Sequence, residues 1–471
     1  MDATSHTFSA NARTALADVK LQRALDRLAE GFPARRRDAV ARLPEFDALR
    51  DAAVAIKDHT ILNLDRYLER FEAKVLEAGG RVHWCRDAAE ARATILSICT
   101  RAKAKSVTKG KTMVGEEIAI NDHLAANGLD VVETDLGEYI IQLRGEPPSH
   151  IIAPAIHLSK DQVADTFRKA HGTLPPARPL TESRALLEEA RTVLRSRFLG
   201  ADVGITGANF LIAETGSTVT VTNEGNAELT MTLPRVHIVL ASIEKVVPTL
   251  EDAATMLRVL ARSATGQDVS VYTSFATGPR RPGDLDGPEE FHVVLLDNGR
   301  STMLEGELRE MLRCIRCGAC LNHCPVYAAV GGHAYGWVYS GPMGAVLTPA
   351  LIGLDPAKHL PEASTLCGRC EEVCPMRIPI PKMLRHWRER SWQRGPSATR
   401  SRFGLAVWAF VAARPWLYRW TTGVVVALLA RFGTRGRFAW LPFASAWTGT
   451  RDFPAPEGRG FVAAWNRGER R

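Results

Sequence analysis

Seven cysteines in two short motifs constrain this chain more than any other feature of its sequence. The first motif has the spacing Cys-x2-Cys-x2-Cys-x3-Cys followed by a proline, and its cysteines are Cys314, Cys317, Cys320 and Cys324. This run binds iron–sulfur clusters in bacterial ferredoxins. Three closely spaced thiolates bind three irons of one cube, and the fourth cysteine, three residues further on, ligates a second cluster. The motif therefore predicts a two-cluster segment.

The second motif is a shortened copy of the first. Cys367, Cys370 and Cys374 match its second, third and fourth cysteines, and Pro375 follows. Ser364 stands where the first cysteine is expected. Applying the crossed rule of two-cluster ferredoxins gives two ligand sets. The predicted ligands are Cys314, Cys317, Cys320 and Cys374 for the first cluster, and Cys324, Cys367 and Cys370 for the second.

The second set leaves one ligand open. It fits a [3Fe–4S] cluster, or a [4Fe–4S] cluster whose fourth ligand is the Ser364 hydroxyl, water or a group from a partner; we expect [4Fe–4S] in the fully loaded form. Zinc is the alternative, but zinc ribbons use four ligands in two pairs. Seven matching positions with a proline after each final cysteine favour clusters. Cys85 and Cys99 lie outside any ligand spacing and are expected to be buried as small apolar side chains.

The size of the chain allows about three domains at roughly 150 residues each. Seven of the nine cysteines fall within 61 residues of a 471-residue chain, which is typical of metal ligands in a reducing compartment rather than of disulfides. The first residues lack the apolar run of a signal peptide. We therefore expect a cytoplasmic protein with four regions: residues 1–80, 81–299, 300–395 and 396–471.

Residues 10–80 have helical periodicity, and residues 81–299 alternate helical stretches with short β-branched runs. This alternation predicts an α/β domain with a mainly parallel sheet covered by helices on both faces. Residues 206–225 read as a hairpin, which would make the sheet mixed. The predicted strands are 81–84, 131–134, 201–205, 217–222, 236–240, 269–272 and 291–296, and the predicted helices are 88–102, 116–127, 183–197 and 249–263.

The last region is rich in tryptophan, arginine and proline. From Arg394 onward its only acids are Asp452, Glu457 and Glu469. The apolar runs 404–413 and 423–430 are far shorter than the ~20 residues that span a bilayer. We expect helices that pack on the cluster domain or on a partner, or that make a peripheral membrane contact.

Several polar residues of the α/β region are candidates for a small-molecule site. The glycine-bearing loop 204–209 and the turns 215–217 and 223–226 could present backbone N–H groups to an anion, or could simply be tight turns. Side chains that could bind an anionic substrate are Lys109, Arg144, His150 and His157. For each of them alone, a solvated or packed role is the alternative, and Glu214 is not assigned a catalytic role.

The stretches around these motifs resemble one family. They are residues 133–143, 204–210, 213–216, 222–226, 331–342 and 344–349. In this order they are similar to the lactate utilisation protein B family, the iron–sulfur subunits of a bacterial three-part L-lactate oxidation system. The resemblance runs from about residue 60 through the tail and includes the missing cysteine of the second motif.

The resemblance implies a fold and a function that the spacing does not show. Residues 81–299 would form a lactate-utilisation (LUD) domain, related to sugar-isomerase and CoA-transferase-like folds, followed by an all-α ferredoxin-type domain. The chain would transfer electrons in a complex that oxidises L-lactate to pyruvate for growth on lactate. Its partners would be lactate utilisation proteins A and C and an electron acceptor that the sequence does not identify.

Three other functions remain open at this point. The same role could serve another 2-hydroxy acid such as glycolate. An iron–sulfur redox sensor would be expected to bind nucleic acid, but no helix-turn-helix pattern is present, so we expect no nucleic-acid partner. A self-contained α/β enzyme for a CoA ester or sugar phosphate would need the clusters only for structure.

Overall fold

The computed structural model describes residues 3–395, 399–441, 448, 451–458 and 460–468. The chain divides into two compact units, Met1–Arg390 and Ser391–Arg471. Each unit is described by itself below.

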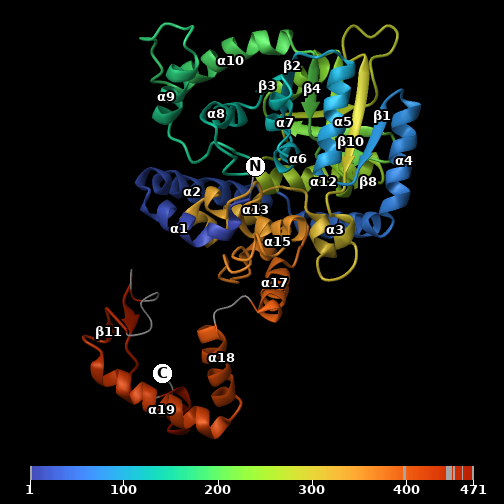
Figure 1. Cartoon of the computed structure of the whole chain (residues 1–471). Helices are drawn as coiled ribbons and strands as arrows, with labels where there is room; N and C mark the ends of the chain where they lie inside the picture. The colour runs from blue at the N-terminus through green and yellow to red at the C-terminus, as the bar shows by residue number, and fades with distance from the viewer. Residues whose placement is uncertain (1–2, 396–398, 442–447, 449–450, 459, 469–471) are drawn as a thin grey trace. The chain divides into compact units, whose positions relative to one another are not determined.

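A six-stranded, wholly parallel sheet forms the centre of the first unit (Figure 1). Its order is β1-β10-β7-β4-β2-β3. The predicted α/β domain with a parallel sheet is thus confirmed. The strands are β1 (Arg81–Cys85), β2 (Ser106–Gly110), β3 (Asp130–Glu133), β4 (Val203–Thr206), β7 (Val236–Ser242) and β10 (Glu290–Leu296).

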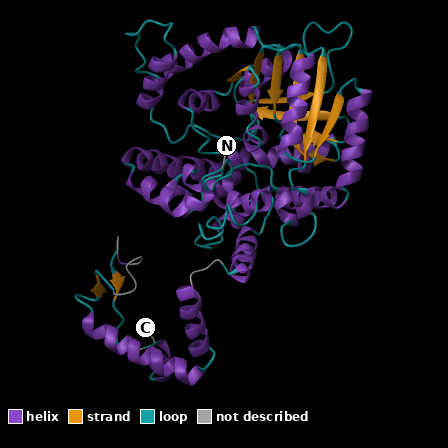
Figure 2. Cartoon of the chain, viewed as in Figure 1, coloured by secondary structure: helices purple, strands orange, loops and turns teal. Residues whose placement is uncertain are grey.

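Helices cover both faces of this sheet (Figure 2). Alternate residues of β7 and β10 point to opposite sides, so each face has its own apolar core. One core holds α5 (Ala88–Arg101), α6 (Met113–Glu117) and α7 (Ile120–Ala126), and the other holds α4 (Leu64–Glu77).

The predicted hairpin is present, but it does not join the main sheet. β5 (Phe210–Ile212) and β6 (Ser217–Thr222) pair antiparallel in a separate four-stranded sheet of order β8-β5-β6-β9. The other two strands are β8 (Val246–Val247) and β9 (Tyr272–Ala276). The expected mixed sheet is therefore wrong: the hairpin residues form a second sheet, and the central sheet stays parallel.

Three local predictions also differ from the structure. Strand β2 was not predicted. The strand predicted at 269–272 is found later in the chain, at Tyr272–Ala276 (β9). The single helix predicted at 116–127 is two helices, α6 and α7. Ala119 separates α6 from α7 because its backbone is left-handed (φ 51°), which ends one helix before the next begins.

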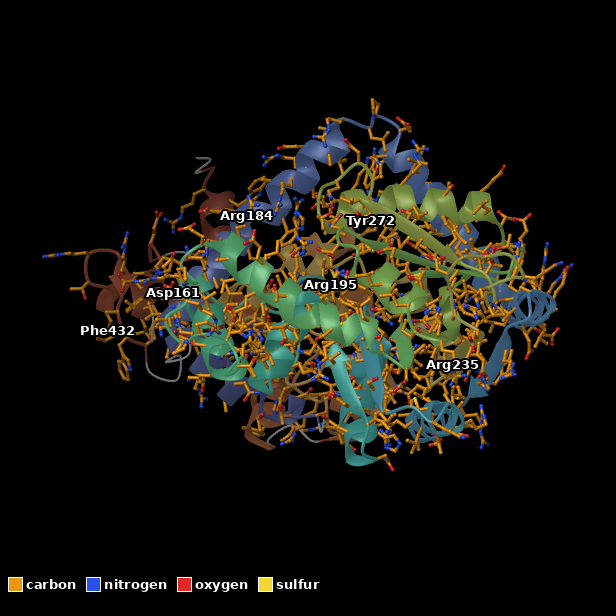
Figure 3. All side chains as sticks on the ribbon, turned by 90° about the horizontal axis from the view of Figure 1, so that it is seen from above. Asp161, Arg184, Arg195, Arg235, Tyr272 and Phe432 are labelled. Atoms are coloured by element: carbon orange, nitrogen blue, oxygen red, sulfur yellow. The ribbon has the colours of Figure 1, made fainter. Side chains whose placement is uncertain are left out.

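A lobe of three helices extends from the β3 edge of the sheet. It consists of α8 (Leu136–Arg144), α9 (Lys160–Ala170) and α10 (Ser183–Leu199), which share an apolar core with Val132. Figure 3 shows Asp161 of α9 and Arg184 and Arg195 of α10 among the exposed side chains of this lobe. The remaining helix of the α/β region, α12 (Leu250–Ala264), packs against α3 (Phe46–Leu62), and α11 (Asn226–Thr232) packs against β4.

The N-terminal helices pack against the cysteine segment. α1 (Phe8–Ala17), α2 (Val19–Ala41) and α3 share one buried core with residues 303–387. Side chains reach across this contact: the Ser5 hydroxyl donates to the Tyr335 carbonyl (2.8 Å), and the Arg50 guanidinium donates to the Cys374 carbonyl (2.7 Å). The two ends of the unit are therefore held together by apolar burial and by hydrogen bonds.

Every element between residues 300 and 395 is helical. The α-helices are α13 (Ala319–Asn322), α14 (Pro325–Val330), α15 (Gly341–Ile352), α16 (Arg369–Glu372) and α17 (Ile380–Arg394). The short 3-10 helices are η3 (Ser301–Met303), η4 (Arg309–Arg313) and η5 (His333–Tyr335).

The second unit contains two exposed apolar helices, α18 (Thr399–Ala412) and α19 (Pro415–Phe432). No residue of α19 is buried, and Trp408, Trp416 and Trp420 are each more than 60% exposed. Two short strands, β11 (Arg437–Phe438) and β12 (Phe453–Pro454), pair antiparallel, and α21 (Phe461–Asn466) follows. Within the described ranges, no helix combines the length and the hydropathy needed to cross a bilayer.

Candidate metal centre

The two cysteine loops have the same backbone course. In the first loop Arg316 and Gly318 have positive φ (59° and 72°), and in the second Leu366 and Gly368 do (55° and 83°). In each loop a short helix, α13 or α16, begins directly after the left-handed glycine. Superposing the two patterns by sequence places Ser364 at the position of Cys314. The loop missing one cysteine therefore keeps the conformation of a cluster-binding loop.

Four cysteines line one small cavity, and they come from both motifs. Its walls include Cys314, Cys317 and Cys320 of the first motif together with Cys374 of the second, and Ile151, Met343 and Ile378 add apolar surface. The predicted first ligand set thus comes together across more than 50 residues of chain.

The other three cysteines form a second group. The pKa of the Cys370 thiol is raised to about 12 by burial and then by Cys324 and Cys367, and the pKa of Cys324 is raised by burial and by Cys367. Cys367 is exposed, whereas Cys324 and Cys370 are buried. These three cysteines thus lie near enough to influence one another's pKa, and Cys367 reaches the surface.

The chemistry of both groups fits an iron–sulfur cluster. Burial raises the pKa of Cys317, Cys320 and Cys374, the last to about 11, and neighbouring thiols raise it further. Crowded buried thiols of this kind are ionised by coordination to a metal, which supplies the missing positive charge. The buried Tyr335 hydroxyl lies beside the Cys324 thiol and has no other hydrogen-bond partner in the described structure, so it is suited to donate to a cluster-bound thiolate.

Ser364 contacts both its own loop and helix α17. Its hydroxyl accepts a hydrogen bond from the backbone N–H of Leu366 (3.1 Å), and its carbonyl accepts one from the Arg388 guanidinium (2.8 Å). The hydroxyl therefore stabilises the turn of the second loop.

The polar candidates of the α/β region do not form an anion site. Lys109 is fully buried and pairs with Glu116 and Glu133, each at 2.7 Å. Burial lowers the pKa of Lys109, but these carboxylates outweigh it and hold the pKa above its usual value. The positive charge of Lys109 is thus already neutralised inside the protein.

The remaining candidates are also engaged. Arg144 and His157 both contact Glu146, at 2.7 and 2.9 Å. Burial lowers the pKa of His150 to about 4, and its ring bonds to Asn322 (2.9 Å). The Glu214 carboxylate accepts the N–H of Leu250 at the start of α12 (3.1 Å).

The glycine-bearing loop after β4 is a packing feature. A Cβ on Gly204 would lie 1.9 Å from the Thr230 carbonyl oxygen, and one on Gly207 would lie 2.3 Å from that of Lys111. These glycines permit close approach of backbone to backbone. The tight-turn interpretation of this loop therefore describes it better than a phosphate site.

A cavity of about 560 Å³ opens beside the carboxyl end of β3 and is lined by residues of α6, α7 and α8. Its lining includes the acids Glu116, Glu133, Glu138 and Glu146. Burial raises the pKa of Glu138 well above its usual value, and neighbouring acids raise it further. Among the described residues, the lining of this cavity includes no lysine or arginine, so it offers no fixed cation to the carboxylate of a 2-hydroxy acid.

Sequence reasoning missed a group of buried charges beside the first cysteine loop. Arg300 is fully buried, and its guanidinium contacts Glu117 (2.6 Å) and Glu244 (3.0 Å). Arg316, inside the cysteine loop, pairs with the same Glu244 at 3.2 Å. Only the position of Arg316 between two ligand cysteines could have suggested this group. Cys85 and Cys99 are buried in the apolar core beneath the sheet, as predicted.

Two known families match the first unit, one over the region that contains the parallel sheet and one over the region that contains the cysteine motifs. Residues 68–296 match the LUD domain, and residues 310–378 match the 4Fe-4S dicluster domain. The chain therefore carries an iron–sulfur segment of the two-cluster type.

Similar proteins match nearly the whole chain. Lactate utilisation protein B of Bacillus licheniformis is 43% identical over 91% of this chain and 89% of its own length. Lactate utilisation protein B of Geobacillus thermodenitrificans is 44% identical over 91% and 90%. An uncharacterized electron transport protein of Escherichia coli, YkgF, is 41% identical over 97% and 96%.

Among solved structures, a DUF162 family protein from Deinococcus radiodurans covers 50% of this chain and 98% of its own at 16% identity, with a TM-score of 0.28, which is too low to inform the fold. The two lactate utilisation B proteins are enough to show the family, because each matches about nine-tenths of both chains at more than 40% identity. The chain belongs to the lactate utilisation protein B family.

Proposed function

We propose that this chain is the iron–sulfur electron-transfer subunit of a complex that oxidises L-lactate to pyruvate and so supports growth on lactate. The observation that carries the proposal is the pairing of cysteines across the two motifs into one group of four and one group of three. Oxidation of lactate to pyruvate releases two electrons and two protons, and two neighbouring clusters accept electrons one at a time. The names of the relatives agree with this role.

We assign the first cluster to Cys314, Cys317, Cys320 and Cys374 as [4Fe–4S]. The second cluster is assigned to Cys324, Cys367 and Cys370. It is [4Fe–4S] with a non-cysteine fourth ligand when fully loaded, and [3Fe–4S] when that iron is lost. The helices between residues 300 and 395 belong to an all-α ferredoxin-type domain, and the sheet belongs to a LUD domain of the sugar-isomerase and CoA-transferase-like type.

The oxidation of lactate itself is assigned to a partner subunit. Four side chains of the α/β region could have bound the substrate carboxylate, but three are paired with carboxylates and the fourth, His150, is a buried, uncharged imidazole. Among the described residues, the lining of the strand-end cavity includes no lysine or arginine that could bind this carboxylate. Lactate utilisation proteins A and C are the expected partners, and the electron acceptor lies beyond this chain.

Reconstitution of the three subunits tests the proposal. The purified complex, prepared without oxygen, is given L-lactate, glycolate or other 2-hydroxy acids with a dye acceptor, and dye reduction is followed. We expect reduction with L-lactate, and its loss when Cys317 and Cys370 are both replaced by serine. Reduction with another acid and none with L-lactate would reassign the substrate, and activity that survives the double substitution would remove the clusters from the electron path.

The second unit is proposed to contact an anionic membrane surface peripherally. Tryptophans and aliphatic side chains of α18 and α19 are exposed, and arginines greatly outnumber acids after residue 394. Exposed apolar surface beside cations is what binds the interface of an anionic bilayer. The protein would then act in the cytoplasm, at the membrane.

A further inference from the structure

A cluster of buried charges joins the α/β sheet to the first cysteine loop. Its members come from six separate places in the chain: helix α3, the end of α6, the segment after β7, the segment after β10, the first cysteine loop, and the stretch before α15. They are Glu117, Glu244, Lys245, Arg300, Lys57, Arg316 and Tyr339. Six of these side chains are less than 10% exposed, and that of Arg316 is 11% exposed.

The contacts form a continuous chain of alternating charge. Arg300 donates two hydrogen bonds to Glu117 (2.9 and 2.6 Å) and pairs with Glu244 at 3.0 Å. Glu244 pairs with Arg316. Tyr339 donates to Glu117 (2.6 Å), and its ring lies 4.9 Å from the Arg316 guanidinium. The chain thus leads from the LUD sheet to a residue of the cavity lined by the four cysteines.

The charges of this cluster do not balance. Lys57, Lys245, Arg300 and Arg316 bring four positive charges, and Glu117 and Glu244 bring two negative ones. Lys57 donates hydrogen bonds to the backbone carbonyls of Glu244 and Val246. Buried charge in excess is costly unless an opposite charge lies close by.

Arg316 joins this excess to the first cysteine group, because it lies between Cys314 and Cys317 and lines the cavity of the four cysteines. Burial lowers the pKa of Lys57 and Lys245 to about 8; Glu244 opposes the decrease in both, and Cys314 opposes it to a smaller extent. In the second cysteine group, burial and Cys367 raise the pKa of Cys324, and burial, Cys324 and Cys367 raise that of Cys370, while backbone N–H groups lower both.

We infer that Lys57, Lys245 and Arg316 are positioning residues that offset the negative charge of the cluster held by Cys314, Cys317, Cys320 and Cys374 and thereby raise its reduction potential. A cluster with four thiolates is anionic, and each electron it accepts adds a negative charge. Fixed cations in a medium of low dielectric constant favour the reduced form. The inference rests on the proposed ligand assignment.

This arrangement gives the LUD domain a part in electron transfer. In open α/β sheets, the carboxyl ends of the strands are where ligands bind. Here Glu244 and Lys245 directly follow β7, and Arg300 follows β10, so this end of the sheet is occupied by charges that face the cluster segment. The domain stabilises the reduced cluster instead of holding a substrate at this place.

Redox titration of the full cluster-loaded chain, followed by EPR, tests the inference. Cys367→Ser first identifies the signal of the second site. In Lys245→Met and Lys57→Met we expect the midpoint potential of the first signal to fall and that of the second to stay, with a larger fall in the double variant. Lys245→Arg should restore the potential. The matched control is Lys382→Met, whose side chain is exposed and pairs with Glu307.

Two outcomes separate this inference from the proposed function. If the wild-type chain shows two cluster signals but the lysine variants leave both midpoints unchanged, the inference is wrong and the electron-transfer role stands. If the wild-type chain carries no iron–sulfur signal, the proposed function fails first. Iron and sulfide counts and far-UV circular dichroism confirm that each variant is folded and loaded; if one lysine variant does not fold, the other still decides the question.

Discussion

Ser364 stands where the first motif has Cys314, and it is the residue that would make the two proposed cluster sites unequal. Its loop repeats the positive φ angles of the first loop, so a cysteine at this position would meet a backbone already shaped for a cluster. We therefore expect Ser364→Cys to complete the second site. The variant should retain more iron per chain and convert any three-iron EPR signal into that of a [4Fe–4S] cluster, as measured by iron and sulfide counts and EPR.

The neighbouring substitution Thr365→Cys is the control, because it adds a thiol without placing it at the ligand position. An unchanged iron count and EPR spectrum in Ser364→Cys would contradict the equivalence of Ser364 and Cys314. Ser364→Ala asks the complementary question, since loss of the fourth iron there would identify the hydroxyl as its ligand.

Arg300 is the residue on which the buried charge cluster depends. Arg300→Met would leave the carboxylate of Glu117 buried without its cation. The carboxylate of Glu244 would lose one of its two arginine partners. Breaking a buried ion pair from one side costs about 3–5 kcal/mol. We expect a loss of this size in the free energy of unfolding, measured by denaturant titration of the cluster-loaded chain.

Arg280→Ala provides the comparison. Its pair with Glu289 is nearly half exposed on both sides, so its loss should cost about 0–1 kcal/mol. Equal losses in the two variants would show that the buried cluster contributes no more than a surface pair.

At the level of helices and strands, local sequence patterns predicted those elements whose formation depends on neighbouring residues. Alternation of helical and β-branched stretches gave the parallel sheet, and the left-handed Gly216 marks the predicted hairpin. β2 was missed because Lys109 interrupts its apolar pattern. The partners that let this lysine be buried, Glu116 and Glu133, lie 7 and 24 residues further along the chain. A strand that buries a charge is recognisable only once its distant partners are known.

The candidate site also contains one part that local sequence predicts and one part that it does not. Cluster ligands follow a fixed spacing, so all seven cysteines could be proposed as ligands from the sequence. The charges around the first loop could not, because Lys57, Glu117, Glu244 and Arg300 are far apart in the chain. Each of them, taken alone, looks like an ordinary solvated residue.

Gly332 shows how the loop before α15 is held against the α/β region. A Cβ at this position would lie 1.7 Å from the Ser149 carbonyl oxygen, which also accepts a hydrogen bond from Tyr327 (2.7 Å). Gly332→Ala must therefore displace backbone from backbone, at a cost of about 1–3 kcal/mol. We expect a lower melting temperature and weaker cluster retention, followed by the decay of cluster absorbance on heating.

Gly172→Ala is the matched control, because nothing lies within 4 Å of its would-be Cβ. If Gly332→Ala melts and loses its clusters no earlier than Gly172→Ala, this contact does not hold the segment in place.

In the chain as a whole, exposed apolar side chains are concentrated on helices α18 and α19 of the second unit. α19 buries no side chain, and Trp416 and Trp420 are 70% and 64% exposed. Apolar surface of this extent is rarely left in water, so it marks a contact with a membrane or a protein. The scarcity of acids after residue 394 makes an anionic bilayer the partner that best fits the charge.

Vesicle sedimentation decides whether a bilayer is that partner. The full chain should bind vesicles containing phosphatidylglycerol, bind vesicles of phosphatidylcholine alone less, and release as salt screens the arginines. The double substitution Trp416→Ser and Trp420→Ser should weaken binding several-fold without changing the iron content. Leu285→Ser, a fully exposed single apolar residue of the first unit, should leave binding unchanged. If vesicles fail to bind while lactate utilisation protein A or C binds in a tryptophan-dependent way, the exposed helices instead form the interface of the complex.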